Sequence, residues 1–342
     1  VGEGIAGTVA QTGRPLIIKD AYKHAKFNPD FDKKTGFKTG SILCAPLVFK
    51  GEVLGVCQVI HGRDKGKVFT ARDLALFRLF CDSAALAIQN ARMHGILLDK
   101  QRMEKDMEFA KTVQESFFQA SCPCIDNFLF AAKTVPALVV GGDFYDFICF
   151  DCNRIAVVLG DVSGKGVSAA LYMARLLSDF RYISQINPEP EAVLAKINNI
   201  LFERAHRGMF ATAMYLLIDP VKMTMKIGNA GHHALLLKNQ GKAVEEKARA
   251  GGPPLGILPN VTFATEEIPL KTGDNILLYT DGLIEPKNIN GEAFGLERLR
   301  KILTQNNLAP EPLLAHIDQS IKKFTGDAPK FDDLTTVAIQ VT

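Results

Sequence analysis

The sequence predicts an α+β protein in two parts that are joined by a helix. In the first part, short strand-like runs alternate with turns and then give way to a helix. From Phe128 onward, longer strand-like runs are interrupted by helical regions. Apolar runs of roughly four to eight residues indicate strands, whereas apolar residues spaced by three and four indicate helices. The second part therefore favours two β-sheets packed face to face with helices outside, although the pattern alone also allows another α+β layering.

The first part predicts a small antiparallel sheet followed by a helix. Three runs have β-branched and apolar strand character: residues 15–18, 41–49 and 53–60. Lys50-Gly51-Glu52 is typical of a tight hairpin connection between the last two runs. Thr70 and Asp73 have the spacing of a capping box, and apolar residues then recur at helical spacing through Asn90.

Residues 94–122 predict a connecting helix. The stretch 94–120 contains no proline, and Pro123 cannot continue a helix. A seam of side chains recurs at spacings of four and three, formed by Met103, Met107, Ala110, Gln114 and Phe117. Such a seam packs on a second helix, so a homodimer through helix 94–120 and docking on the protein's own second part are equal alternatives.

The second part predicts an ordered series of strands and helices. We expect strands at residues 128–133, 144–150, 155–159, 211–218, 223–227, 234–237, 275–279 and 335–341. We expect helices at residues 165–183, 190–204, 296–304 and 310–324.

Aspartates stand where these strand runs end or begin. They are Asp143, Asp161, Asp281 and the pair Asp332-Asp333. Alone, each is an ordinary turn residue or helix cap. Several carboxylates at one sheet edge would repel one another unless cations shared them, and oxygen-only ligands suit Mg²⁺ or Mn²⁺. The pattern therefore favours a two-metal hydrolase.

The blocks around these aspartates also resemble, in order, those of the SpoIIE/RsbU-type metal-dependent (PPM) serine/threonine phosphatases. The blocks are Val140–Asp146, Gly160–Gly166, Asn229–His232, Tyr279–Glu285 and Phe331–Thr335. The resemblance covers residues 123–342. It implies an α-β-β-α sandwich of two antiparallel sheets flanked by helices, with two or more Mn²⁺ or Mg²⁺ ions per phosphatase domain.

The same resemblance implies a role for each site residue. Asp161 would bridge two cations, and the Val162 carbonyl would bind one of them. Asp281 and Asp332 would complete the other site, and Asp143 would act through metal-bound waters. Whether Asp332 or Asp333 is the direct ligand stays open. Residues that would support the ligands, or leave space beside them for a phosphopeptide, are Asp146, Asp333, Gly164, Gly166 and His232.

The implied reaction is hydrolysis of a phosphoserine or phosphothreonine monoester by a metal-activated water. The implied partner is a phosphorylated protein of the anti-anti-sigma kind, an anti-sigma-factor antagonist in bacterial partner switching. A catalytically silent module that only binds a phosphoprotein is the alternative, but the loss of a ligand aspartate that would mark it is not seen. Gly160–Gly166 lacks the spacing and hydroxyl of a P-loop.

Residues 1–93 resemble a GAF sensory domain that starts in mid-domain. The resemblance is carried by Gly2–Gly7, Phe27–Pro29, Lys34–Phe37, Ser41–Leu47 and Ala85–Arg92. His61-Gly62 and Leu74 depart from the motif of cyclic-nucleotide-binding members. Because Val1 is not a methionine, we expect further residues before it. The resemblance implies that the GAF part and the connecting helix regulate the phosphatase.

Composition sets the outer limits. The net charge is +3, and Lys and Arg are scattered, which argues against a nucleic-acid partner. No apolar run reaches the roughly 20 residues that span a bilayer, so we expect no membrane contact in this part of the protein and a cytoplasmic location. Cys44, Cys57 and Cys81 lie in apolar runs as reduced thiols, and Cys149 with Cys152 lacks the second pair that zinc needs.

Overall fold

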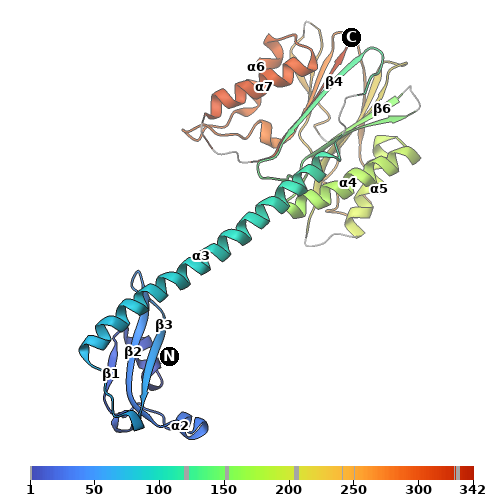
Figure 1. Cartoon of the computed structure of the whole chain (residues 1–342). Coiled ribbons are helices and arrows are strands. Elements are labelled where there is room, and N and C mark those ends of the chain that lie inside the picture. Colours follow the sequence, from blue (N-terminus) through green and yellow to red (C-terminus); the bar gives the residue numbers. More distant parts are fainter. Residues whose placement is uncertain are drawn as a thin grey trace. The chain divides into compact units, whose positions relative to one another are not determined.

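The computed structural model divides the chain into two compact units, Val1–Glu104 and Lys105–Thr342 (Figure 1). The structure describes residues 2–118, 123–150, 154–203, 208–240, 242–249, 251–326, 328 and 332–342. Within these ranges, none of the helices combines the length and the apolar character that crossing a bilayer would need.

The first unit is built on a three-stranded antiparallel sheet in the order β1-β2-β3. Its strands are β1 (Leu16–Ile18), β2 (Thr39–Phe49) and β3 (Glu52–Gly62), as the sequence predicted. Lys50 and Gly51 both have positive φ, the backbone conformation that closes a two-residue hairpin. The helical elements are α1 (Gly4–Thr12), η1 (Ala21–Lys23), α2 (Asp30–Thr35) and η2 (Arg63–Lys65).

The long helix α3 (Ala71–Glu115) leaves the first unit and ends in the second. Its start is the predicted capping box, since the Thr70 amide donates to Asp73 Oδ2 at 2.7 Å and the Asp73 amide to Thr70 Oγ1 at 3.3 Å. The prediction that the helix continues to residue 120 was wrong. The chain turns at Ser116 because Phe117 and Phe118 pack against the core of the second unit. Residues 119–122, including Cys122, lie outside the described residues.

The second unit contains two five-stranded sheets, in which every strand pair is antiparallel. One sheet has the order β10-β9-β12-β13-β4, formed by Val244–Lys247, Leu235–Lys238, Asn275–Tyr279, Leu334–Val341 and Phe128–Val135. The other has the order β11-β8-β7-β6-β5, formed by Thr265–Pro269, Thr224–Ala230, Ala211–Asp219, Arg154–Val162 and Phe144–Phe150.

The layers follow from which side chains each face buries. Phe147, Val157 and Leu216 of one sheet lie in one core cluster with Leu278 and Val337 of the other. Helices α4 (Val167–Ile186) and α5 (Pro190–Glu203) cover the outer face of the β5-containing sheet, and α6 (Gly295–Gln305) and α7 (Pro310–Thr325) cover the other (Figure 1). The predicted α-β-β-α sandwich is confirmed.

Two strands were not predicted. Strands β10 and β11 are short, lie at sheet edges and carry adjacent glutamates, Glu245-Glu246 and Glu266-Glu267. Glutamate has low strand propensity, so the pairing with β9 and β8 decides their conformation.

Candidate metal centre

The predicted aspartates come from both sheets of the sandwich. Asp143 directly precedes β5, and Asp161 is the penultimate residue of the neighbouring strand β6. Asp281 begins the short helix η3 (Asp281–Leu283) after β12, and Asp332 lies just before β13. The Thr280 hydroxyl donates to Asp143 Oδ2 at 2.8 Å and so joins the two sheets. The structure therefore gathers these carboxylates at one edge of the sandwich.

The neighbours Asp332 and Asp333 do different things. Asp333 is only 8% exposed, and its two carboxylate oxygens accept the amides of Ala137 and Gly142, each at 2.7 Å. A Cβ on Gly282 would lie 1.9 Å from the Asp333 carbonyl oxygen, so only glycine fits there. Asp332 instead faces Lys165, whose Nζ lies 2.9 Å from its Oδ2. Both carboxylate oxygens of Asp333 are therefore engaged by backbone amides, whereas the Asp332 carboxylate is paired with a lysine.

The carboxylates raise one another's pKa. Burial, followed by the charge of Asp161, raises the pKa of Asp143 well above its ordinary value. Burial and the charges of Asp281 and Asp332 raise the pKa of Asp161 to about 7. The pKa of Asp281 is raised by burial and by Asp332. Negative charges close together disfavour ionisation, and a bound cation would reverse that effect.

The donor set fits hard divalent cations by its chemistry. It offers carboxylate oxygens, the ligands that Mg²⁺ and Mn²⁺ prefer. Among the described residues, no group of three or more His, Cys, Asp or Glu side chains has a geometry that could hold a metal ion. Burial and the neighbouring carboxylates raise the pKa of Asp143 and Asp161, and a bound cation would offset this repulsion.

The two glycines of the loop after β6 both have positive φ. Gly164 and Gly166 have φ of +100° and +75°, and a Cβ on either would meet nothing within 4 Å. Between them, Lys165 reaches Asp332. The glycines thus turn the chain beside the carboxylates and leave open space over it.

Asp146 is turned away from the carboxylate cluster. Its Oδ2 accepts Arg181 Nε of α4 at 2.5 Å, and the same guanidinium donates to the Phe117 carbonyl at 2.7 Å. The contacts of Asp146 therefore hold α4 and the end of α3 on strand β5.

His232 is a buried support for the loop that follows β8. Its Nδ1 lies 2.7 Å from Thr212 Oγ1, and its Nε2 lies 3.1 Å from the Tyr279 carbonyl oxygen. Burial and, to a smaller extent, the neighbouring His233 lower the pKa of His232 to about 3. A neutral ring with both nitrogens engaged suits the orienting role that the sequence predicted.

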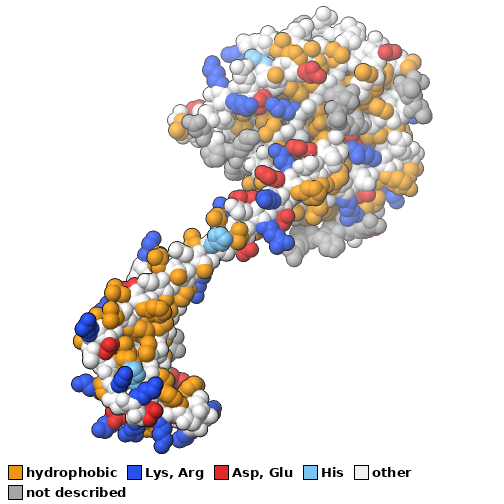
Figure 2. Space-filling model, viewed as in Figure 1, with side chains coloured by type: hydrophobic (Ala, Val, Ile, Leu, Met, Phe, Trp, Pro, Cys, Tyr) orange, Lys and Arg blue, Asp and Glu red, His pale blue; other side chains and the backbone are white. Residues whose placement is uncertain are grey.

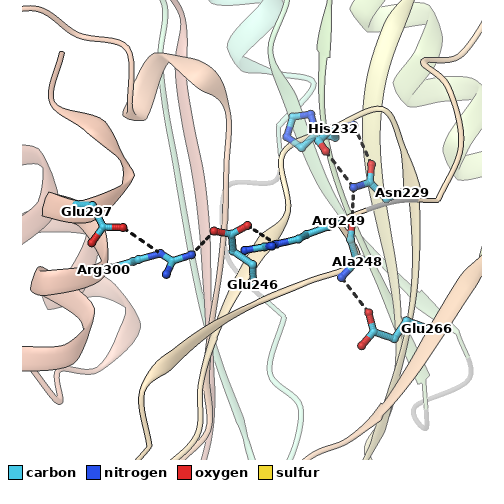
Figure 3. A network of polar contacts seen from close by, with 8 residues as sticks. All are labelled: Asn229, His232, Glu246, Ala248, Arg249, Glu266, Glu297 and Arg300. Carbon is cyan, nitrogen blue, oxygen red and sulfur yellow. Dashed lines mark hydrogen bonds and ion pairs between the residues drawn. The ribbon is translucent and has the colours of Figure 1, made fainter.

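Asn229 holds the backbone of this loop (Figure 3). Its Oδ1 accepts the His232 amide at 2.7 Å, and its Nδ2 donates to the carbonyls of His232 at 2.9 Å and Ala248 at 2.6 Å. The Ala248 amide donates to Glu266, and the neighbouring segment continues into ion pairs among Arg249, Glu246, Arg300 and Glu297. Asn229 therefore ties the loop after β8 to the segment around Ala248.

Sequence reasoning missed several residues that shape the site. Thr280 bonds to Asp143, and Lys165 pairs with Asp332. Gln114 donates to the Gly141 carbonyl at 2.7 Å and accepts the Gly141 amide at 3.1 Å, so the end of α3 holds the loop before Asp143. Thr280 and Lys165 adjoin predicted motif residues, which was an available signal. For Gln114, the sequence indicated a position in the helix seam but not its contact with the loop before Asp143.

The sandwich has the fold of PP2C-type phosphatase domains. The structure is similar to the SiaA-PP2C domain of Pseudomonas aeruginosa, with a TM-score of 0.63 and 19% identity over 71% of this chain and 99% of that chain. The SpoIIE family model, stage II sporulation protein E, matches residues 151–342, and the GAF domain model matches residues 1–88. The chain belongs to the SpoIIE family and carries a GAF domain before its phosphatase domain.

Two curated relatives align with more than two thirds of the chain. Phosphoserine phosphatase RsbU of Bacillus subtilis is 27% identical over 244 residues, which cover 70% of this chain and 71% of RsbU. Protein IcfG of Synechocystis is 27% identical over 261 residues, which cover 68% of this chain. The aligned part spans 41% of the length of IcfG.

Proposed function

We propose that this chain hydrolyses phosphoserine or phosphothreonine monoesters in a protein, with two divalent cations, Mn²⁺ or Mg²⁺, bound at the carboxylate edge. The observation that carries the proposal is the convergence of Asp143, Asp161, Asp281 and Asp332, where burial and the charges of the neighbouring carboxylates raise the pKa of the first three. Such a cluster is costly unless cations neutralise it, and a phosphoryl group supplies oxygens that the same cations bind.

The metal-holding residues we propose are Asp161 shared by both ions, the Val162 carbonyl, and Asp281 with Asp332. Asp143 supports them through water, held in place by the Thr280 hydroxyl. When bound, the cations lower the pKa of a coordinated water and neutralise the phosphoryl oxygens. Asp333 and Gly142 keep the two loops of the site together, and Lys165 offers a positive charge beside Asp332.

The substrate we propose is a phosphorylated protein of the anti-anti-sigma kind. The family membership and the relative named phosphoserine phosphatase RsbU support this choice. We assign residues 1–93 as the sensory part, 94–122 as the connecting segment, which is helical as far as Glu115, and 123–342 as the phosphatase. The cytoplasmic location stays a prediction.

Phosphate release by the purified chain tests the proposal against a silent binding module. A serine-phosphorylated peptide and a small chromogenic phosphate ester are incubated with Mn²⁺, with Mg²⁺ or with chelator. We expect release that saturates with metal and stops with chelator. Binding of the phosphopeptide without release at any Mn²⁺ concentration would favour the silent module, and release that chelator leaves unchanged would exclude both.

Helix α3 supports a homodimer as well. Its first-unit segment exposes hydrophobic side chains (Figure 2), and members of this set recur at seven-residue spacing: Leu79, Leu86 and Met93, and Ile96 and Met103. Such a repeat suits a second copy of the same helix. Gln114 and Phe117 belong to the second unit and bond within it, so intramolecular docking involves the end of the helix.

Two substitutions separate these uses of the helix. Met103 is 70% exposed, so Met103→Glu should lower the dimer population in sedimentation velocity without altering monomer stability. Phe117→Glu should instead destabilise the second unit and reduce phosphatase activity, because it places a charge against the core beside Arg181. A monomeric wild type, or a dimer that Met103→Glu leaves intact, would contradict the proposed dimer.

A further inference from the structure

A polar cavity of about 150 Å³ opens beside two of the candidate ligands. It is lined by Asp161, Thr212, Gly231, His232, His233 and Asp281. The cavity thus lies between the carboxylate edge and the loop that follows β8. The loop therefore borders the space beside the carboxylates.

The two adjacent histidines of the loop have different surroundings. His232 is buried and uses both ring nitrogens, toward Thr212 and the Tyr279 carbonyl. His233 is exposed, and its ring stacks on Tyr279 with centroids 5.8 Å apart and planes 19° apart. Within the described residues, no hydrogen bond is made by the ring nitrogens of His233. Stacking on a buried tyrosine fixes the plane of the ring and leaves its edge available to a ligand.

The backbone that carries His233 is held firmly. Asn229 bonds to both the amide and the carbonyl of His232. Gly231 has φ of +68°, and a Cβ there would lie 2.6 Å from Pro254. A loop fixed on both sides positions a side chain before a ligand arrives, which lowers the cost of ordering it on binding.

We propose that His233 contacts the substrate by donating a ring N–H hydrogen bond to the phosphoryl group of a phosphoserine or phosphothreonine bound at the carboxylate edge. The neutral imidazole carries one N–H, so the contact requires no change of its charge. This inference rests on the proposed phosphatase function and deepens it. It assigns His233 to substrate binding, whereas His232 supports the loop.

The test measures binding of substrate and metal separately. A peptide with a non-hydrolysable phosphonate analogue of phosphoserine is titrated by fluorescence anisotropy into Mn²⁺-loaded protein, and Mn²⁺ alone is titrated by calorimetry. His233→Ala should weaken peptide binding about tenfold, the effect of losing one hydrogen bond to a charged group. Its Mn²⁺ affinity and thermal midpoint should match those of the wild type. His233→Gln, which keeps an N–H donor, should recover most of the peptide affinity.

His94→Ala is the matched control, because His94 is an exposed histidine of α3 in the first unit. In turnover with the phosphopeptide, His233→Ala should raise KM with little change in kcat, the signature of lost substrate binding. Unchanged peptide affinity in His233→Ala, or a parallel loss of Mn²⁺ affinity, would overturn the inference. A wild type that binds Mn²⁺ but neither binds nor hydrolyses phosphopeptide would overturn the phosphatase function as well.

Discussion

Both units of the protein bury aspartates, and two of these, one in each unit, are held in opposite ways. Asp32 of the first unit is 5% exposed, and Asp143 of the second is 4% exposed. Asp32 accepts the Thr39 amide and hydroxyl, each at 2.7 Å, and the Tyr22 hydroxyl at 3.0 Å. Asp143 accepts the Thr280 hydroxyl but faces the carboxylate of Asp161.

The surroundings shift the pKa of the two aspartates in opposite directions. Burial alone would raise the pKa of Asp32, but the Thr39 and Tyr22 donors outweigh it and lower that pKa. At Asp143, burial and the charge of Asp161 act together to raise the pKa. A buried carboxylate with enough donors stabilises a fold, whereas one among other carboxylates costs stability until something else neutralises it. The neighbours of a buried charge therefore separate a structural aspartate from a functional one.

The largest expected effect is on turnover. Asp161→Ala removes the carboxylate that both cations would share, so metal-dependent phosphate release should fall by at least about 10³-fold. Asp32→Ala is the matched change of a buried aspartate in the other unit and should leave turnover per folded molecule unchanged. Activity of a folded Asp161→Ala protein near the wild-type level would break the functional assignment of the second-unit cluster.

Metal addition should stabilise only the second unit. At a free Mn²⁺ concentration of about 100 times Kd, binding adds roughly 2.7 kcal/mol to the free energy of unfolding. Hydrogen exchange should therefore slow in peptides from β5 and β6 and not in peptides from β2. Asp161→Ala should abolish the slowing. Equal protection of both units would show that Mn²⁺ acts elsewhere.

Neutralising the two aspartates should change stability in opposite directions. Asp32→Asn leaves donors without an anionic acceptor and should lower the free energy of unfolding of the first unit by about 1 to 3 kcal/mol. Asp143→Asn removes a repelled charge and should raise the stability of the metal-free second unit. Denaturant unfolding with chelator present measures both. Loss of stability in Asp143→Asn as large as in Asp32→Asn would remove the contrast.

The smallest effect is the pH dependence of the metal-free protein. The pKa of Asp161 is raised from 3.8 to about 7, so its ionisation opposes folding: the penalty is absent below pH 3.8 and complete above about pH 7. With chelator, the thermal midpoint of Asp161→Asn should exceed that of the wild type by several degrees at pH 8, on the order of 2–4 °C per kcal/mol. The difference should vanish near pH 4, and a difference that does not depend on pH would contradict the raised pKa.

Elements with strong local signals were predictable. Strands β5 and β12 were predicted at the bounds they have, and the Thr70–Asp73 capping box and the Lys50-Gly51 turn appeared where their residues indicated. The end of α3 and the edge strands β10 and β11 were not predictable. Their conformation depends on contacts with distant residues, such as that of Gln114 with Gly141.

The sequence by itself determined the alternation of strands and helices, the family motifs and the identities of the aspartates, because these depend on residue type and short spacing. Only the tertiary structure decided how neighbouring residues divide their tasks. Asp333 accepts the Gly142 amide, whereas Asp332 pairs with Lys165. The His232 ring is buried, whereas the exposed His233 ring opens on the cavity. Adjacent residues on an extended chain point in opposite directions, so their roles depend on what the fold brings to each side.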